Sequence, residues 1–196
     1  MEPDIAEIKE NYARFSDEKL IRLATEDAAS LRPEALEALK EILRDRCISE
    51  EIIRGIDAQL KDIDESSLED YAEILRNLPC PMCNSSAEKL NATIVYKVKS
   101  FFLTYFEMEF KIACPKCLDE LNRDAMFKSG LLGWWGLPWG IIRTVQSLIG
   151  NKKMIKQNRL PEANYLLMNF VFERVGRIEA NRNNPEELQL MIKHIR

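Results

Sequence analysis

The sequence has few of the residues that enzyme sites use most often. Its 196 residues include a single histidine, His194, near the end of the chain. Histidine is the commonest general acid–base residue and a member of most catalytic triads. A chain with a single histidine therefore lacks the usual means of forming such sites. Neither common phosphate loop, Gly-x-Gly-x-x-Gly or Gly-x-x-x-x-Gly-Lys-Ser/Thr, occurs. We therefore expect a protein that is not an enzyme.

A long uninterrupted apolar run is also missing. The most weakly charged stretch, residues 129–151, has Arg143 as its only charge. A helix that spans a membrane needs about 20 apolar residues. Here Pro138 and several glycines interrupt the stretch, and an arginine at the centre of a bilayer costs at least about 3 kcal/mol. A simple membrane-spanning helix is therefore not expected.

The overall composition is that of an ordinary globular protein. Hydrophobic residues make up 46% and charged residues 31% of the chain, which is enough for a sizeable core in one or two domains. No secretory signal peptide is visible, and five cysteines fit a reducing compartment. We therefore expect a cytoplasmic protein, either free or associated with the inner membrane.

Charge is divided unevenly along the chain. Residues 1–79 contain 21 acidic and 11 basic residues, whereas residues 80–196 contain 11 acidic and 17 basic ones. The first part should repel nucleic acid and anionic lipid, while the second can approach either. An acidic helical face is usually just a solvated one, so the first part alone indicates no partner.

Two Cys-x-x-Cys hooks are the most specific feature of the sequence. They are Cys80-Pro-Met-Cys83 and Cys114-Pro-Lys-Cys117. Two residues between cysteines let one tight turn supply two thiolates, and zinc is held by four ligands in a tetrahedron. The spacing predicts one zinc site with these four cysteines as ligands. Four thiolates leave no position for a catalytic water, so the expected role is structural.

Two other uses of the hooks are less well supported. A thioredoxin-type dithiol would need a βαβ context, and one hook would be enough. A disulfide framework would suit a small secreted domain and would leave Cys47 unpaired.

The segment between the hooks has the pattern of a β-hairpin. Residues 93–98 are rich in β-branched side chains, and residues 106–112 alternate apolar and charged residues, as a half-buried strand does. Residues 100–105 would connect the two strands. Asn84 follows the first hook, and asparagine tolerates positive φ. Leu118 follows the second hook, where we expect a helix to begin directly after Cys117, with its N-terminus near the thiolates.

Hooks and hairpin together resemble a zinc ribbon or the related treble clef, over residues 78–127. Helices are expected on both sides of this module. Before it, residues 1–78 form an acidic helical region with starts at Ser16, Pro33, Ser49 and Ser66 or Ser67, whose apolar stripes pack as a small bundle. After it, helices start near residues 161 and 185.

All three tryptophans lie in one glycine-rich segment, at Trp134, Trp135 and Trp139. A short amphipathic helix over 141–149 follows, and then a basic cluster of Lys152, Lys153, Lys156 and Arg159. Two interpretations remain open. Tryptophan favours the headgroup level of a membrane, where the basic cluster would contact anionic lipid. Tryptophan is also common in cores, so the segment would then plug the space beside the zinc module.

The string Gly-Trp-Trp-Gly-Leu-Pro-Trp-Gly, at 133–140, resembles a motif of uncharacterised bacterial zinc-ribbon proteins that also carry apolar segments. The resemblance, taken with the hooks, covers residues 78–150. It implies a combined architecture of zinc ribbon and apolar segment, and no activity.

The expected fold is α+β and mostly α. Its parts are an acidic helical region (1–78), a zinc-ribbon-like module (79–127), a Trp/Gly-rich segment (128–150) and C-terminal helices (151–196). The expected function is that of a non-enzymatic, zinc-stabilised interaction protein, which contacts a protein partner or the inner membrane surface through the tryptophans and the basic cluster.

Two alternatives remain open. The first is nucleic-acid binding through lysines near the hooks and aromatic residues that stack on bases, among them Phe101, Phe102 and Tyr105; the acidic pI near 5.3 argues against it. The second is an immunity or regulatory protein that neutralises a basic partner. No small-molecule substrate is indicated.

Overall fold

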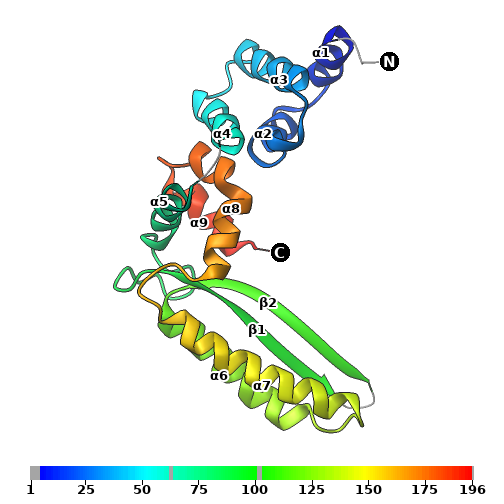
Figure 1. The fold of residues 1–196 in the computed structure, drawn as a ribbon, viewed down its shortest axis with the longest axis vertical. Coiled ribbons are helices and arrows are strands. Elements are labelled where there is room, and N and C mark those ends of the chain that lie inside the picture. Colours follow the sequence, from blue (N-terminus) through cyan, green and yellow to red (C-terminus); the bar gives the residue numbers. More distant parts are fainter. Residues whose placement is uncertain (1–4, 62–63, 101–102, 196) are drawn as a thin grey trace. The chain divides into compact units, whose positions relative to one another are not determined.

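The computed structural model describes residues 5–61, 64–100 and 103–195 and has an α+β fold dominated by helices (Figure 1). The described residues form nine α-helices, one short 3-10 helix and one antiparallel β-hairpin. They divide into two compact units. Unit one contains the described residues before 72 together with 169–185, and unit two contains 72–168 together with 186–195.

Unit one is built from short amphipathic helices around an apolar core. They are α1 (Ile5–Ala13), α2 (Asp17–Glu26), α3 (Pro33–Asp45) and α4 (Glu50–Leu60), with most of α5 (Glu65–Arg76) and the later part of α8 (Tyr165–Ala180). A 3-10 helix covers Ala28–Ser30. Leu20, Leu39, Leu43 and Ile56 are fully buried. Burial of apolar side chains with charges outside is the usual way such helices are held together.

Most of the helix starts predicted in this unit are confirmed. The Ser16 hydroxyl accepts a hydrogen bond from the backbone N–H of Lys19, Pro33 is the first residue of α3, and Ser49 caps α4. The start predicted at Ser66 or Ser67 is wrong. Helix α5 begins at Glu65, because the Asp64 carboxylate accepts the backbone N–H of Ser67 at 2.9 Å and takes the capping position.

Unit two is organised around the β-hairpin. Strands β1 (Asn91–Ser100) and β2 (Thr104–Ala113) pair antiparallel, with Asn91 opposite Ala113 and Ser100 opposite Thr104. Helices α6 (Pro115–Leu132) and α7 (Trp139–Asn158) pack against each other and along β1 (Figure 1). Most of α9 (Pro185–Lys193) also belongs to this unit.

The hairpin is longer than the sequence pattern predicted. The expected connection, 100–105, is too long, because the ladder continues to Ser100 and Thr104, whose hydroxyls lie 2.8 Å apart. Strand β2 is also less buried than its alternation predicts. Met108 is 61% exposed although Ile112 is buried, because α6 and α7 cover β1 rather than β2.

The helices of unit two cross the boundaries expected from composition. The boundaries after residues 127 and 150 both lie inside helices, α6 and α7. The short helix expected over 141–149 is part of the 20-residue helix α7. Helix α8 starts at Tyr165 instead of near residue 161, because the Asn164 side chain caps it by accepting the backbone N–H of Leu167 at 3.0 Å.

Candidate metal centre

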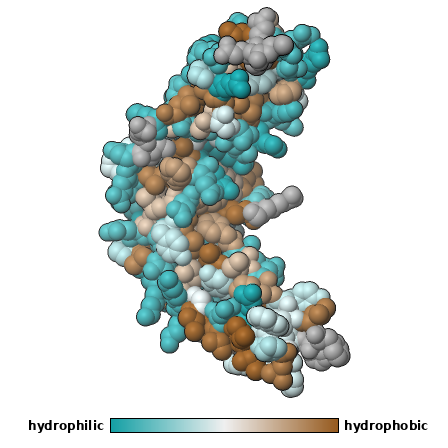
Figure 2. Space-filling model, turned by 45° about the vertical axis from the view of Figure 1, so that its right-hand side comes forward, coloured by the Kyte–Doolittle hydropathy of each residue, from teal (hydrophilic) through white to brown (hydrophobic). Residues whose placement is uncertain are grey.

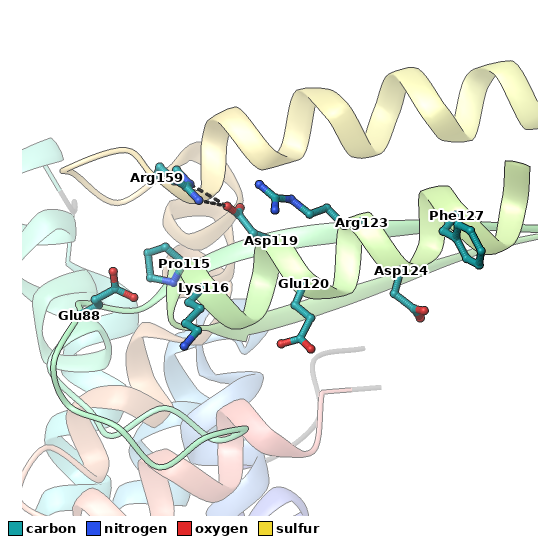
Figure 3. A pocket seen from close by; sticks show the side chains of 9 residues that line it. All are labelled: Glu88, Pro115, Lys116, Asp119, Glu120, Arg123, Asp124, Phe127 and Arg159. Atoms are coloured by element: carbon teal, nitrogen blue, oxygen red, sulfur yellow. Dashed lines mark hydrogen bonds and ion pairs between the residues drawn. The ribbon is translucent and has the colours of Figure 1, made fainter.

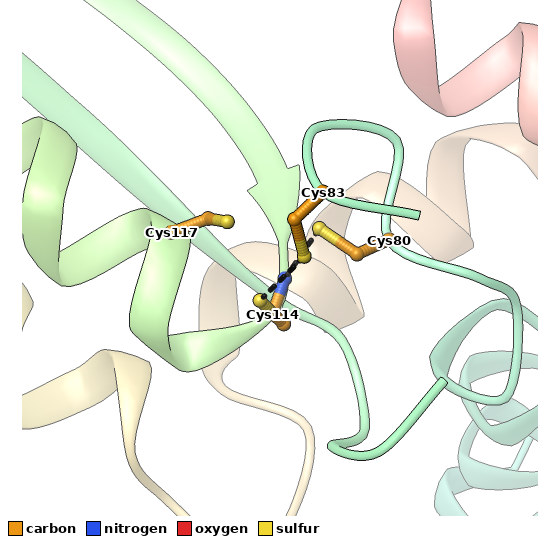
Figure 4. Close-up of side chains that lie close together, drawn as sticks. All are labelled: Cys80, Cys83, Cys114 and Cys117. Atoms are coloured by element: carbon orange, nitrogen blue, oxygen red, sulfur yellow. Dashed lines mark hydrogen bonds between the residues drawn. The ribbon is translucent and has the colours of Figure 1, made fainter. Parts of the chain in front are cut away.

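The four hook cysteines come together in unit two as predicted. Their sulfur atoms all lie within 4.8 Å of one another, and the side chains converge on one point (Figure 4). The Sγ atoms of Cys83 and Cys114 are 3.7 Å apart. Tetrahedral zinc with Zn–S bonds of about 2.3 Å places its sulfurs about 3.8 Å apart. The cluster therefore has the dimensions of a four-thiolate metal site.

The first hook is a tight turn closed by backbone hydrogen bonds. The N–H of Asn84 donates to the carbonyl of Cys80 at 2.8 Å, and the N–H of Cys80 donates to the carbonyl of Ser85 at 2.9 Å. Asn84 has a φ of 58°, which confirms the positive φ expected after this hook. The turn aims Cys80 and Cys83 at the same point.

The second hook is the start of helix α6. Cys114 is the residue before the helix, and the N–H of Leu118 donates to the Cys114 carbonyl at 3.0 Å as the first helical bond. The predicted start after Cys117 is thus too late, because Pro115 already occupies the first helical position, which proline favours. Leu118 is helical, so this hook needs no positive φ. The helix N-terminus lies beside the sulfurs, as expected.

Three of the four cysteines are buried, and their thiols differ in acidity. Burial raises the pKa of Cys80, but hydrogen bonds from the backbone N–H groups of Cys114, Cys83 and Met82 outweigh it and bring the pKa to about 7. Burial raises the pKa of Cys114 and of Cys117, and neighbouring thiols raise that of Cys117 further. Four thiolates this close repel one another, so a bound cation is what allows all of them to ionise.

The predicted contact residues lie elsewhere in unit two, and none of the tryptophans plugs a core. Trp134, Trp135 and Trp139 are 42%, 69% and 62% exposed. The indole Nε1 of Trp134 donates a hydrogen bond to the carbonyl of Gly130 at 2.6 Å. The buried-plug interpretation of the segment is therefore wrong.

The basic cluster is divided between two environments. Lys152, Lys153 and Lys156 are exposed along the last turns of α7. Arg159 instead forms an ion pair with the buried carboxylate of Asp119, with Nη2 2.6 Å from Oδ2. Arg159 therefore ties the end of α7 to α6, while the three lysines face solvent.

The tryptophan segment is the end of a larger exposed apolar surface. It is formed by the last turns of α6, by the first turns of α7, and by the segment that connects these two helices, which contains Trp134 and Trp135. We call this surface the apolar tip and define it by six residues that are 43% to 79% exposed, namely Phe127, Leu131, Trp135, Leu137, Trp139 and Ile142. Apolar side chains gather at the bottom of the space-filling view, over this end of the helices (Figure 2).

The interior beneath the apolar tip is polar, which sequence reasoning missed. The outer edge of β1 receives hydrogen bonds from helix side chains instead of from a third strand. Asn151 accepts the N–H of Tyr96 at 3.1 Å and donates to the Tyr96 carbonyl at 2.7 Å. Asn122 donates to the carbonyl of Ile94 at 3.1 Å, and Ser129 accepts the N–H of Val98 at 3.0 Å. These four backbone groups of the edge are thereby satisfied.

The buried positions of α7 repeat at steps of three and four residues. They are Gly140, Thr144, Ser147, Asn151, Met154 and Asn158. All of them except Met154 are polar or have no side chain, so the inward face of α7 is mainly polar. The outward face is apolar over the first turns of the helix. The same step pattern of asparagine, serine and glycine is visible in the sequence and is the signal that could have predicted this arrangement.

Glycine lets the two helices approach closely at the apolar tip. A side chain on Gly140 would place its Cβ 2.7 Å from the carbonyl oxygen of Gly133, a distance that real Cβ atoms do not adopt. Gly133 and Gly140 thus serve the contact between α6 and α7.

A groove of about 890 Å3 lies along α6 next to the hooks (Figure 3). Its lining side chains carry both signs of charge and include the Asp119–Arg159 pair. They include neither a histidine nor a cysteine, so the groove adds no ligand to the metal centre.

No protein-family model, curated protein or solved structure matches this chain. Within the described residues, no helix is both long enough and apolar enough to cross a membrane. The site must therefore be interpreted from its own chemistry.

Proposed function

We propose that this chain is a non-enzymatic, zinc-stabilised interaction protein. In this proposal zinc on Cys80, Cys83, Cys114 and Cys117 fixes the base of the hairpin and of α6, as in a zinc ribbon or treble clef. The apolar tip at the far end of the same elements is the contact surface for a protein partner or for the inner surface of a membrane. The resemblance to bacterial zinc-ribbon proteins with a tryptophan motif agrees with this division of roles.

One observation carries the proposal: unit two buries polar side chains and exposes apolar ones at its tip. Asn122, Ser147 and Asn151 are fully buried, while Trp135 and Leu137 are 69% and 79% exposed. Large contiguous apolar surfaces on soluble proteins mark interaction sites. A closed four-thiolate centre supplies rigidity and no reactive position, so binding is better supported than catalysis.

Nucleic-acid binding draws less support from the same residues. Lys97, one of the lysines proposed to contact phosphate, forms an ion pair with Glu109. Phe101 and Phe102, two of the proposed stacking residues, lie outside the described residues. The apolar tip, with its exposed tryptophans, is the larger feature to explain.

Metal content tests the first half of the proposal. The full chain, purified without chelator, should contain about one zinc per molecule by elemental analysis. The double variant Cys80→Ser, Cys117→Ser should lose the metal, and Cys47→Ser should retain it. Metal-free protein whose four hook cysteines are oxidised to disulfides would overturn the proposal.

Site-specific photo-crosslinking tests the second half. A photoreactive phenylalanine analogue at Leu131, which is 63% exposed in the apolar tip, should give crosslinked products in living cells. The same analogue at Phe172, which is 61% exposed in unit one, is the matched control. Products at Leu131 above the control support a contact surface, whether they contain protein or lipid. Equal, background labelling at both positions would contradict it.

A further inference from the structure

We propose that the occupant of the apolar tip is the interface of an anionic lipid bilayer, which the tip enters from one side without crossing it. This inference rests on the proposed function and names the partner of the same surface. Three observations of unit two support it: what lies inside the tip, which residues lie on its outside, and how charge follows them along α7.

The first observation is the composition of the contact between the helices and β1. In water, helices are held together by burying apolar faces, whereas in lipid they pack through small residues and interhelical hydrogen bonds. The buried positions of α6 and α7 nearest the tip are small, although Val95 and Val98 of β1 are buried as well; the helix positions are Ala125, Ser129, Gly140, Thr144 and Ser147. Ser147 donates to the Tyr96 carbonyl at 2.7 Å and lies 3.2 Å from the Ser129 hydroxyl, and Gly140 abuts Gly133. The two helices thus meet through the kind of contact that helices use in lipid, with large apolar side chains on their outer side.

The second observation is the kind of residue at the extreme end. Trp135 and Trp139 are 69% and 62% exposed, and Leu137 between them is 79% exposed. Tryptophan is enriched at the level where headgroups meet acyl chains. Interfacial segments bury their apolar face about 5–10 Å into this boundary. The indole rings and Leu137 are placed to enter it first.

The third observation is the charge that follows the apolar residues. Between Phe127 and Arg159 the chain has five basic residues and no acidic one. Lys152, Lys153 and Lys156 continue the outward side of α7 after its apolar turns, opposite the buried positions. Lys152 lies 13 residues after Trp139, about 20 Å along the helix. With the outward side of α7 lying along the membrane surface, these lysines are near the headgroup phosphates, where each is worth about a fivefold change in binding.

A protein partner fits this charge pattern less well. Protein interfaces are enriched in tryptophan but depleted of lysine. Here three exposed lysines extend the apolar surface on the same side of one helix. Anionic lipid contacts both parts of that surface at once, because the tryptophans are buried at the hydrocarbon boundary and the lysines pair with the phosphates. Arg143, which lies over the ring of Phe106 at 4.9 Å, sets a limit on depth because an arginine resists entry into hydrocarbon.

Vesicle sedimentation is the direct test. The zinc-loaded full chain should sediment with vesicles of phosphatidylcholine and phosphatidylglycerol in equal parts, and much less with phosphatidylcholine alone. Its tryptophan emission should shift to the blue and be quenched by lipids brominated near the headgroup. Raising the salt concentration should weaken binding, since screening shortens the reach of the lysines to about 10 Å or less.

Matched variants identify the surface. Trp135→Ala with Trp139→Ala should reduce partition at least tenfold, and Phe172→Ala should not change it. Lys152→Glu with Lys153→Glu should reduce partition at least tenfold on anionic vesicles only, and Lys193→Glu, the same charge reversal elsewhere, should have little effect. Unchanged zinc content shows that each variant is folded.

The alternative outcomes are distinct. A zinc-loaded chain that remains in solution with anionic vesicles, or that forms a dimer dependent on Trp135 and Trp139 instead, overturns the lipid inference and leaves the proposed function standing. Partition that survives both the tryptophan and the lysine variants also overturns it. Loss of the proposed function itself would appear earlier, as a chain without metal or without crosslinks at Leu131.

Discussion

The two units of this protein differ in what their helix contacts bury. In unit one, leucine and isoleucine side chains such as Leu39 and Ile56 are fully buried and charged residues lie outside. Unit two also buries apolar side chains, among them Leu118 and Leu167, but the contact between β1 and its helices adds asparagine and serine, and tryptophan and leucine are exposed at the tip. Hydrophobic burial therefore stabilises both units, and in the second unit the hydrogen bonds to β1 and the four-cysteine centre are added to it.

Removal of the metal should have the largest effect, and the effect should fall on unit two. A strong chelator should unfold the hairpin and the start of α6, because structural zinc contributes on the order of 10 kcal/mol in small metal modules. Helices α2 and α3 should keep their structure. Hydrogen exchange followed by mass spectrometry would measure this as lost protection over 91–132 and retained protection over 17–45. Equal loss in both segments would show that the contrast is wrong.

Truncation of the core of unit one comes next. Leu39→Ala should lower the free energy of unfolding by about 2–5 kcal/mol, since it removes buried methyl groups and leaves a cavity. Leu137→Ala, the same change at a side chain that is 79% exposed in the apolar tip, should alter it by about 0.5 kcal/mol or less. Urea denaturation of both variants measures the pair. A large loss for Leu137→Ala would mean that the tip is part of a core.

Replacement of a polar residue by an apolar one should be harmful inside unit two. Asn151→Leu leaves the Tyr96 N–H without its partner and removes one of two donors to the Tyr96 carbonyl, and a buried group left unsatisfied costs about 1–3 kcal/mol. The matched change on the exposed side of the same helix, Gln146→Leu, should cost much less. Thermal unfolding monitored by circular dichroism would compare the two. Equal melting temperatures would indicate that the hydrogen bonds to β1 contribute nothing to stability.

The smallest effect should come from the ion pair across the hairpin. The hydrogen bond and charge of Lys97 lower the pKa of Glu109 below its ordinary value of 4.5, against a smaller opposing effect of burial. A lowered folded-state pKa stabilises the fold above pH 4.5, and this contribution is lost as pH falls through the folded-state pKa. Glu109→Gln should therefore lower stability at pH 7 by about 1 kcal/mol or less.

Unfolding of this variant and the parent chain at pH 7 and at pH 3 is the measurement. The difference between the two chains should be present at pH 7 and should shrink or vanish at pH 3. A difference that grows toward acid pH would contradict the sign of the pKa shift.

Much of the metal centre could be predicted because it depends on local spacing. Two residues between cysteines force a turn, and an alternating segment of the right length brings the hooks together, as the 3.7 Å separation of the Cys83 and Cys114 sulfurs shows. The positive φ of Asn84 was predictable for the same local reason. The start of α6 was placed too late because its signal, Pro115, was assigned to the hook alone.

The arrangement beneath the apolar tip could not be predicted in this way. Asparagine and serine in a sequence usually indicate loops, caps or solvated faces, and nothing local shows that Asn122 and Asn151 face a strand edge. Their role depends on which helix lies beside β1, a long-range contact. Cys47 illustrates the same limit. Nothing in its local sequence shows whether it is buried; it is exposed, with a φ of 53° after the end of α3.

The side chains that complete the edge of β1 have a consequence for how the chain can associate. A strand edge with free N–H and C=O groups is a template for another strand, and proteins protect such edges against aggregation. On β1 the side chains of Asn122, Asn151 and Ser129 hydrogen-bond to the backbone groups of this edge. Helices α6 and α7 therefore take the place of a neighbouring strand. A chain that lost Asn151 would be less stable and would also present a new edge for pairing with other chains. Asn151 thus supports both the stability of this hairpin and its solubility.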